Sequence, residues 1–426
     1  MLSMSEQSTL KKKTRRRIGV GQLSIVEHSL CPLDQKRSRA NGLVHAARYN
    51  YSDAQRRRQT ATVRIFAPLG LTSGDEVYLW GLLALTLSQP ESNGTLIATP
   101  HWCLRQMGLI DSGSRRGGRQ YRQFAAALER LSVVNYLSDA CYDPARSEYR
   151  RVSFRFLSYS LPTNPDSSRA WTIAWDKIFY SMIRETGGSM RFDLDTYRSL
   201  DPASRRLFLL ILKIGYRQGR LPVLELRNLA VDVLGLSPTL AVRDMKVKVD
   251  RTLQRLESAG VISEPSIIRI GAGHYQVAFA RGEFLDTASN RVTRPLVEDS
   301  PLIDGLLAVG FDHASAVQIV NRYPQHLVAQ WTDITQAALE RFGKHHFRKS
   351  PMAYLVDSLS KAARGIRTPP DWWHEVRRKE QKTAKPNSKG RKILGELLDE
   401  VFGAERNKSD ATSKPESTAA LLKTLA

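Results

Sequence analysis

The chain carries the sequence SRRGGRQYRQFAAALERL at residues 114–131 and the sequence PTLAVRDMKVKVDRTLQRLESA at residues 238–259. Both stretches repeat apolar residues at helical spacing and place basic residues on the opposite face. Each follows the same order of expected elements, namely a helix, a short strand and a second helix, and each runs into an extended segment. A recurring motif of this kind indicates a duplicated structural unit. We therefore expect two copies of one unit, each with a basic third helix.

In the first copy, the expected elements are a helix at 76–88, a strand at 95–98, a helix at 100–107 and the basic helix at 114–131. The last helix turns apolar residues such as Phe124 and Leu128 to one side and arginines to the other. An ordinary solvated helix would intersperse carboxylates among them, and only Glu129 does so. Arginine contacts phosphates and pairs with guanine. The candidate DNA contacts here are Arg115, Arg116, Arg119, Arg122 and Gln123.

An extended hairpin is expected after this helix, over residues 133–142 and 149–159. In its second strand, Val152, Phe154 and Phe156 alternate with polar residues, which is the pattern of a half-buried strand. Arg151 and Arg155 would then point outward along a sugar–phosphate backbone. The apolar stretch 171–184 is expected to be a helix that links the two units.

The second copy is expected to have helices at 204–217 and 227–234, a strand at 221–226, the basic helix at 238–259 and a tight glycine hairpin over 267–280. Asp244 and Asp250 dilute the positive face of its third helix, so the signal is weaker than in the first copy. The candidate DNA contacts are Arg243, Lys246, Lys248, Arg251, Arg255 and, at the hairpin tip, His274.

Three helices followed by a hairpin describe a winged helix. We expect an α+β fold with two tandem winged-helix domains, followed by a small all-α C-terminal domain and flanked by basic disordered tails. The expected boundaries are 1–61 for a basic, largely disordered N-terminal arm, 62–185 and 186–285 for the winged-helix domains, 300–373 for the helical domain and 374–426 for the basic tail.

The composition favours a polyanionic partner. Lys and Arg number 64 against 42 for Asp and Glu, giving a net charge of +22. The three cysteines are widely spaced and indicate neither a disulfide framework nor a zinc site. No apolar stretch is long enough to span a membrane, and no signal peptide follows the basic N-terminus. We expect a cytoplasmic protein that does not bind membranes.

No phosphate-binding loop of the type G-x-x-x-x-G-K-[ST] occurs. The pair His345-His346 lacks the spacing of a nuclease metal site, and Asp193 with Asp195 is better explained by capping and surface charge. We expect no catalytic residues, no metal and no cofactor.

The chain resembles plasmid replication initiators, most closely those of the replication initiator protein A type. The resemblance covers about residues 60–290 and includes the opening Leu71-Thr72-Ser73-Gly74-Asp75-Glu76-Val77-Tyr78-Leu79-Trp80, the Arg-rich helix and the second winged helix. The patterns Tyr323-Pro324 and Ser350-Pro351-Met352-Ala353-Tyr354-Leu355 resemble the helical domain appended to some such initiators.

This resemblance implies a protein that binds repeated double-stranded DNA sites at a plasmid origin, promotes opening of the adjacent duplex, and recruits the host replication initiator and replicative helicase. It also implies copy control through a homodimer that represses its own promoter, and a bacterial protein associated with the nucleoid or a plasmid. The second basic helix would be the main base reader. Two alternatives stay open, a tandem winged-helix transcriptional repressor and a nuclease or primase acting at an origin.

Overall fold

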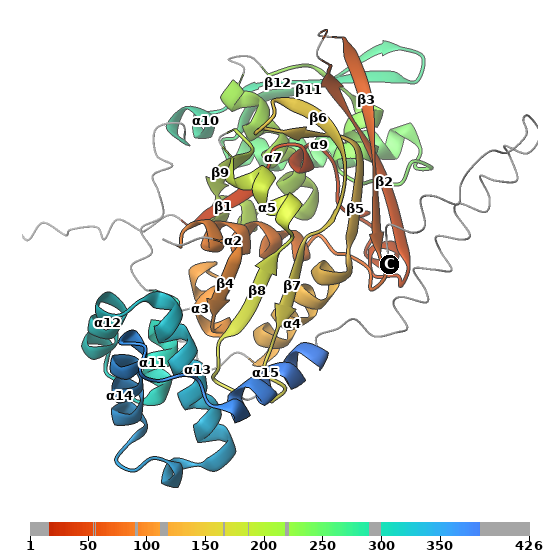
Figure 1. Cartoon of the computed structure of the whole chain (residues 1–426). Coiled ribbons are helices and arrows are strands. Elements are labelled where there is room, and N and C mark those ends of the chain that lie inside the picture. The colour runs from red at the N-terminus through yellow and green to blue at the C-terminus, as the bar shows by residue number, and fades with distance from the viewer. Residues whose placement is uncertain are drawn as a thin grey trace, which may run out of the picture.

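The computed structural model describes residues 17–53, 55, 57–89, 93–110, 118–164, 167–185, 187–217, 221–288 and 300–383. These residues form helices and small antiparallel sheets, as Figure 1 shows, so the expected mixture of the two is confirmed. None of the helices in this part of the chain is long and apolar enough to cross a membrane.

The largest sheet is built partly from the segment expected to be an arm. Strands β2 (Leu43–Ser52) and β3 (Arg58–Ala67) pair antiparallel, and the sheet continues through β5 (Asn135–Asp143) to β6 (Glu148–Arg155). The expectation of a largely disordered arm is therefore wrong for the described residues before 62. One apolar side chain in two is enough for a strand to bury a face. The basic residues of the outer face masked this alternation.

The chain also folds before this sheet. Strand β1 (Ile18–Gln22) pairs antiparallel with β9 (Ser189–Asp193), far along the sequence. A Cβ at Gly19 would lie 2.4 Å from atoms of the Phe192 ring, so the close crossing requires glycine. The short helices η1 (Ile25–Glu27) and α1 (Gln35–Ser38) connect β1 to β2. The N-terminal segment thus joins the two expected domains.

The helices of the first unit follow the expected order. They are α2 (Asp75–Leu87), α3 (Pro100–Gln106) and α4 (Gly118–Val133), with strand β4 (Thr95–Ala98) between α2 and α3. The Thr99 side chain accepts a hydrogen bond from the backbone N–H of Trp102, and Pro100 occupies the first turn, as the Thr99-Pro100 pair predicts.

The strands that accompany this unit differ from the expectation. The hairpin of β5 and β6 exists, but it joins β3, whereas β4 pairs with β8 (Trp171–Trp175), which in turn pairs with β7 (Leu157–Ser160). The expected helix 171–184 is wrong in its first part, because the chain is a strand until Trp175. Only α5 (Lys177–Arg184) is helical. The alternation of aromatic and small residues in 171–175 suits a strand.

The second unit has the expected order throughout. Helix α6 (Leu194–Ser199) leads into α7 (Pro202–Arg217), followed by β10 (Leu224–Glu225), α8 (Leu226–Asn228) with the π-helical turn η2 (Leu229–Val233), and α9 (Val242–Ser258). The hairpin of β11 (Ile262–Gly271) and β12 (His274–Arg281) comes next, and α10 (Glu283–Ala288) ends the unit. The three strands form one antiparallel sheet with β12 in the middle.

The two units share one hydrophobic core, which runs from Val20 to Leu285. At their junction, the Arg206 guanidinium on α7 donates to the Glu76 carboxylate on α2, with Nη2 to Oε1 at 2.6 Å, and to the Leu234 carbonyl. Both side chains are almost completely buried. A Cβ at Gly235, which has φ +80°, would lie 2.5 Å from Arg206. The two units therefore share one core and a buried ion pair at their junction.

The buried His28 and the half-buried His45 at this junction predict acid sensitivity. Burial lowers the pKa of His28 from its ordinary value of 6.5 to about 4 and that of His45 to about 3. Between pH 6.5 and those values the unfolded chain binds protons that the folded chain does not, so stability falls as pH falls. We expect urea unfolding at pH 7 and pH 5 to show a smaller acid-induced loss for His45→Gln than for the unchanged protein. An equal loss would contradict the assignment.

The C-terminal part forms a helical domain with its own core around Leu306, Trp331 and Leu355. Its helices are α11 (Ile303–Val309), α12 (His313–Arg322), α13 (Gln325–Phe342), η3 (Lys344–His346), α14 (Pro351–Ala363) and α15 (Asp371–Thr383). The expected boundary at 373 is too early, because α15 continues to Thr383. Residues 384–426 of the expected tail lie outside the described residues.

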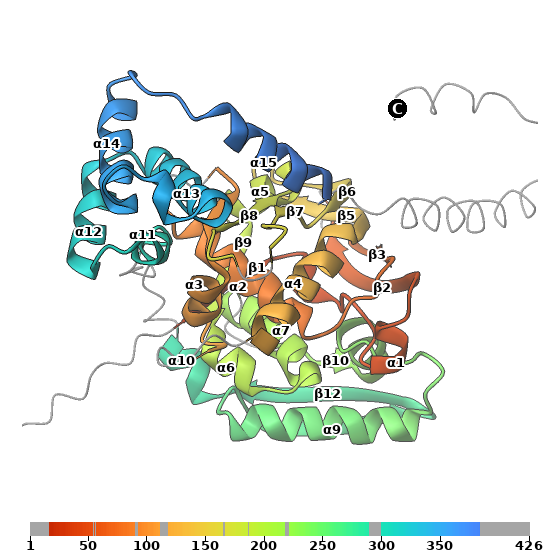
Figure 2. The ribbon, with the colours of Figure 1, turned by 90° about the horizontal axis from the view of Figure 1, so that it is seen from below.

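This domain is attached to the first unit by buried charges. Arg169, in the loop between β7 and β8, donates to Asp333 at 2.8 Å and to Glu380 of α15 at 2.6 Å. The indole N–H of Trp373 donates to Asp333 as well, at 2.7 Å. Figure 2 shows α15 lying along the side of the first unit. These contacts fix the position of α15 against the first unit, because moving it away would leave the buried charge of Arg169 without its Glu380 partner, which is energetically costly.

Candidate nucleic-acid interface

Helix α9 presents a cationic face to solvent. Arg243, Lys248 and Arg251 are exposed, and none of them makes an ion pair with another described residue. The opposite face is buried, with Met245, Val249, Leu253 and Leu256 in the shared core. Figure 2 shows α9 at the edge of the molecule with β12 on its inner side. The structure thus has the amphipathic helix that the sequence predicts.

Two other basic residues of α9 are engaged. The Arg255 guanidinium forms a 2.6 Å ion pair with Asp201, which directly precedes α7. The Lys246 ammonium lies 4.4 Å from the centre of the Tyr275 ring on β12, a cation–π contact. That contact places the N-terminal half of α9 beside the end of the hairpin. His274 is exposed at this end, as expected.

Helix α4 is amphipathic too, but only part of its basic face is free. Arg119, Arg122 and Gln123 are exposed, whereas Phe124 and Leu128 are buried. Arg130, expected on the same basic face, is instead bound bidentately to the buried carboxylate of Asp75 at 2.7 and 2.9 Å. The hydrogen bonds with Asp75 raise the pKa of Arg130. Arg115 and Arg116 lie outside the described residues.

Arg151 and Arg155 are exposed on β6, on the outer side of the four-stranded sheet. Strand β6 belongs to the four-stranded sheet, whereas β4 belongs to a separate three-stranded sheet. The inward alternation of Val152 and Phe154 is confirmed. The three-stranded sheet of this unit is formed by β4, β8 and β7.

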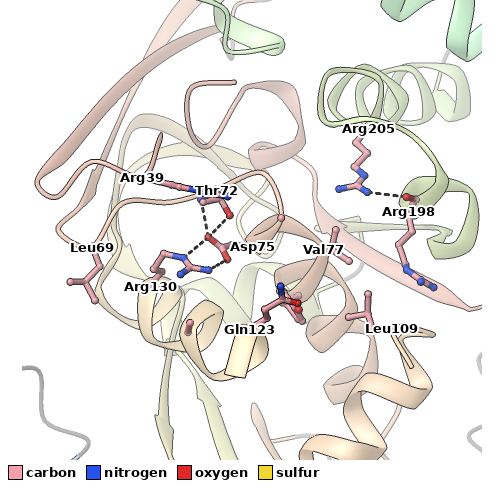
Figure 3. A pocket seen from close by; sticks show the side chains of 13 residues that line it. Arg39, Leu69, Thr72, Asp75, Val77, Leu109, Gln123, Arg130, Arg198 and Arg205 are labelled. Atoms are coloured by element: carbon pink, nitrogen blue, oxygen red, sulfur yellow. Dashed lines mark hydrogen bonds and ion pairs between the residues drawn. The ribbon is translucent and has the colours of Figure 1, made fainter. Parts of the chain in front are cut away.

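A groove rich in arginine lies between α2, α4 and the segment of α6 and α7 (Figure 3). Its volume is about 700 Å³. Four guanidiniums and a single carboxylate belong to its lining, which consists of Arg39, Leu69, Thr72, Gly74, Asp75, Val77, Tyr78, Leu109, Gln123, Ala126, Arg130, Arg198 and Arg205.

The charges in this groove are only partly compensated. Arg198 shares the Asp195 carboxylate with Arg17, at 3.3 and 3.0 Å, and Arg205 donates only to backbone carbonyls. Burial lowers the pKa of Arg198, and the nearby guanidiniums of Arg17 and Arg205 lower it further against the pull of Asp195. The groove is therefore electropositive and suited to an anion.

Sequence reasoning missed this groove because its arginines come from segments that are far apart in the chain.

A second hollow has a volume of about 590 Å³. It is lined by Ser199, Leu200, Asp201, Arg255, Ser258 and Ala259. Residues of α4 line the first hollow, and Arg255 and Ser258 of α9 line the second.

The carboxylates considered for metal binding have other partners. Asp193 accepts a hydrogen bond from the Thr196 backbone N–H and caps α6, and Asp195 pairs with Arg17 and Arg198. Among the described residues, no group of three or more His, Cys, Asp or Glu side chains is placed to hold a metal ion.

The likeness of the chain to known proteins is distant. No protein-family model matches the chain, and no curated protein matches it. Among solved structures, the chain is similar to domains 2 and 3 of RctB, with a TM-score of 0.39 and 14% sequence identity. The match covers 60% of this chain and 96% of that one.

Proposed function

We propose that this chain is a sequence-specific double-stranded DNA-binding protein that initiates plasmid replication without catalysing a reaction. The observation that carries the proposal is the exposed cationic face of α9, where Arg243, Lys248 and Arg251 make no ion pair with described residues, directly followed by the antiparallel hairpin β11–β12. A helix, a strand, a second helix, a third helix and a hairpin, in this order, make a winged helix. The third helix of such a unit fits the major groove, and its hairpin reaches the flanking backbone.

Base reading is assigned to α9, with Arg243, Lys248 and Arg251 as its contacts. Arginine pairs bidentately with guanine, which gives sequence choice, whereas lysine adds affinity through phosphates. The buried opposite face holds the helix rigid, because Met245 and Leu253 are fixed in the core. Affinity would be strongly salt-dependent, since counterions are released from DNA on binding.

The exposed arginines of α4 and the arginine groove are proposed to contact phosphates rather than bases. The groove's guanidiniums are partly held by backbone carbonyls and carboxylates, which limits their freedom to read base edges. Because both units share one core, α4 and α9 would bind as a single rigid surface. Recruitment of the host initiator and replicative helicase, and repression by a homodimer, are proposed from the resemblance to plasmid initiators.

The proposal is tested by footprinting the purified protein on the DNA that flanks its own gene. Protected, regularly repeated sites are expected. A plasmid that carries only the gene and these repeats should then persist in a host, which separates an initiator from a repressor. Incubating supercoiled origin DNA with Mg²⁺ should give neither nicks nor primers, and either product would favour the nuclease or primase.

Removing the exposed arginines of α4 should weaken binding without changing sequence choice. For Arg119→Ala with Arg122→Ala, the slope of log affinity against log salt is expected to flatten by about 0.9 for each phosphate that the protein no longer neutralises. Arg184→Ala with Arg348→Ala removes the same charge from exposed positions elsewhere and is the matched control. Equal slopes for the two double variants would exclude α4 from the interface.

A further inference from the structure

The hairpin β11–β12 exposes large apolar side chains near its tip. Ile268 and Ile270 have exposed fractions of 50% and 57%. Ile267, which precedes them on the same strand, packs against the core. Ile268 pairs with Gln276 across the hairpin, and Ile270 follows it by two residues on β11. Arg269 lies between them in sequence and is exposed too. Such side chains do nothing for the core of this unit.

The position of this apolar pair relates it to the cationic helix. Ile270 directly precedes the turn Gly271-Ala272-Gly273, in which Gly273 adopts φ +75°. The strand pairing is irregular between Arg269 and Gly271, which frees the end of the hairpin from the regular ladder. The contact between Lys246 and Tyr275 sets the tip beside the N-terminal half of α9. In Figure 2 the long strand β12 runs beside α9.

The charges at this end favour a polyanion over an apolar protein surface. Three basic residues lie at this end: Lys246 contacts the Tyr275 ring, Arg269 pairs with Tyr275 across the hairpin, and His274 directly precedes Tyr275. The carboxylate of Glu225 on β10 accepts hydrogen bonds from the N-terminus of α8 and is thereby engaged. An isoleucine at a hairpin tip, surrounded by basic groups, matches the chemistry of a wedge that unstacks bases in the minor groove.

We propose that Ile270, supported by Ile268, is inserted between base pairs of the minor groove while α9 occupies the adjacent major groove. Arg269 contacts the neighbouring sugar–phosphate backbone. This inference rests on the proposed DNA binding and adds to it a means of distorting the duplex. Kinking by an inserted side chain needs no nucleotide hydrolysis, because bent DNA wraps more of the protein surface and that binding offsets the cost of unstacking.

The test compares two double variants. The first combines Ile268→Thr and Ile270→Thr, and the control combines Val223→Thr and Ile366→Thr. Threonine keeps the β-branch that suits a strand. The control changes two exposed apolar side chains elsewhere, Val223 and Ile366, whose exposed fractions are 54% and 68%. The DNA is a protected origin fragment, end-labelled for energy transfer to report bending. Permanganate reactivity of its thymines reports unstacking, and thermal unfolding checks that each variant is folded.

The unchanged protein and the control pair are expected to bend the fragment and expose reactive thymines. The Ile268 and Ile270 variant should still bind the fragment, yet lose both signals. Bending and reactivity equal to those of the unchanged protein would overturn the wedge. A lower sedimentation mass of this variant than of the unchanged protein, both without DNA, would also overturn the wedge, because it would assign the two isoleucines to contacts between copies of the chain. If the unchanged protein protects no DNA at all, the proposed function itself fails, which is a separate result.

Discussion

Replacing Arg243 and Arg251 together by alanine is expected to abolish protection of the repeated origin sites and leave the protein folded. Both side chains are exposed on α9 and make no ion pair with described residues, so their removal creates no cavity and leaves no buried charge unpaired. Each bidentate base contact contributes about 1–3 kcal/mol, so removing both arginines costs about 2–6 kcal/mol of binding free energy. Footprinting and titration at fixed salt measure this loss.

The control must separate base reading from simple loss of charge. Arg184→Ala with Arg348→Ala removes two exposed positive charges from α5 and the C-terminal domain, and it should weaken binding only slightly. An origin fragment with altered repeats supplies the second control. The Arg243 and Arg251 variant should bind both fragments with similar weak affinity. If it still prefers the natural repeats as strongly as the unchanged protein does, α9 is not the base reader.

The variant Arg206→Met is expected to lower the free energy of unfolding by about 3–5 kcal/mol, because it leaves the buried Glu76 carboxylate without its partner. Burial by itself lowers the pKa of Arg206, but Glu76 and Cys31 raise it above its usual range, so the guanidinium is firmly charged. The substitution also removes the hydrogen bond to the Leu234 carbonyl. Urea unfolding at neutral pH measures the effect.

A double variant distinguishes the ion pair from ordinary packing. Arg206→Met combined with Glu76→Leu removes both charges and keeps most of the volume, so it should be less destabilised than Arg206→Met alone. The two units share one core, so probes placed in these two units should report one transition. Separate transitions for the α4 and α9 regions in the unchanged protein would contradict the shared core.

The amphipathic helices could be predicted from the sequence, because the spacing of apolar residues that indicates them is a local pattern. The apolar spacing of Met245, Val249 and Leu253 alone predicts which face of α9 is buried, and the Thr99-Pro100 pair predicts where α3 begins. The hairpin β11–β12 followed from its glycines and alternating residues. These features need only neighbours within a few turns of chain, which sequence spacing records directly.

The pairing of strands that are distant in the chain could not be predicted from the sequence. No local sequence pattern indicates that β4 pairs with β8 rather than with the hairpin of β5 and β6, and none indicates that β1 pairs with β9. The segment before residue 62 was misread because its outward basic residues lowered the average apolarity. Its buried face alternates with a period of two, a signal that such averages hide.

The sequence by itself determined the cationic helices, because charge and helical phase are properties of a single segment. Only the tertiary structure decided which of those charges are free, since Asp75 binds Arg130 and Asp201 binds Arg255 from other parts of the chain. It also brought distant arginines into one groove and merged the two units into a single core. The physical reason is that ion pairing and burial depend on distance in space, which long-range packing sets and sequence order does not.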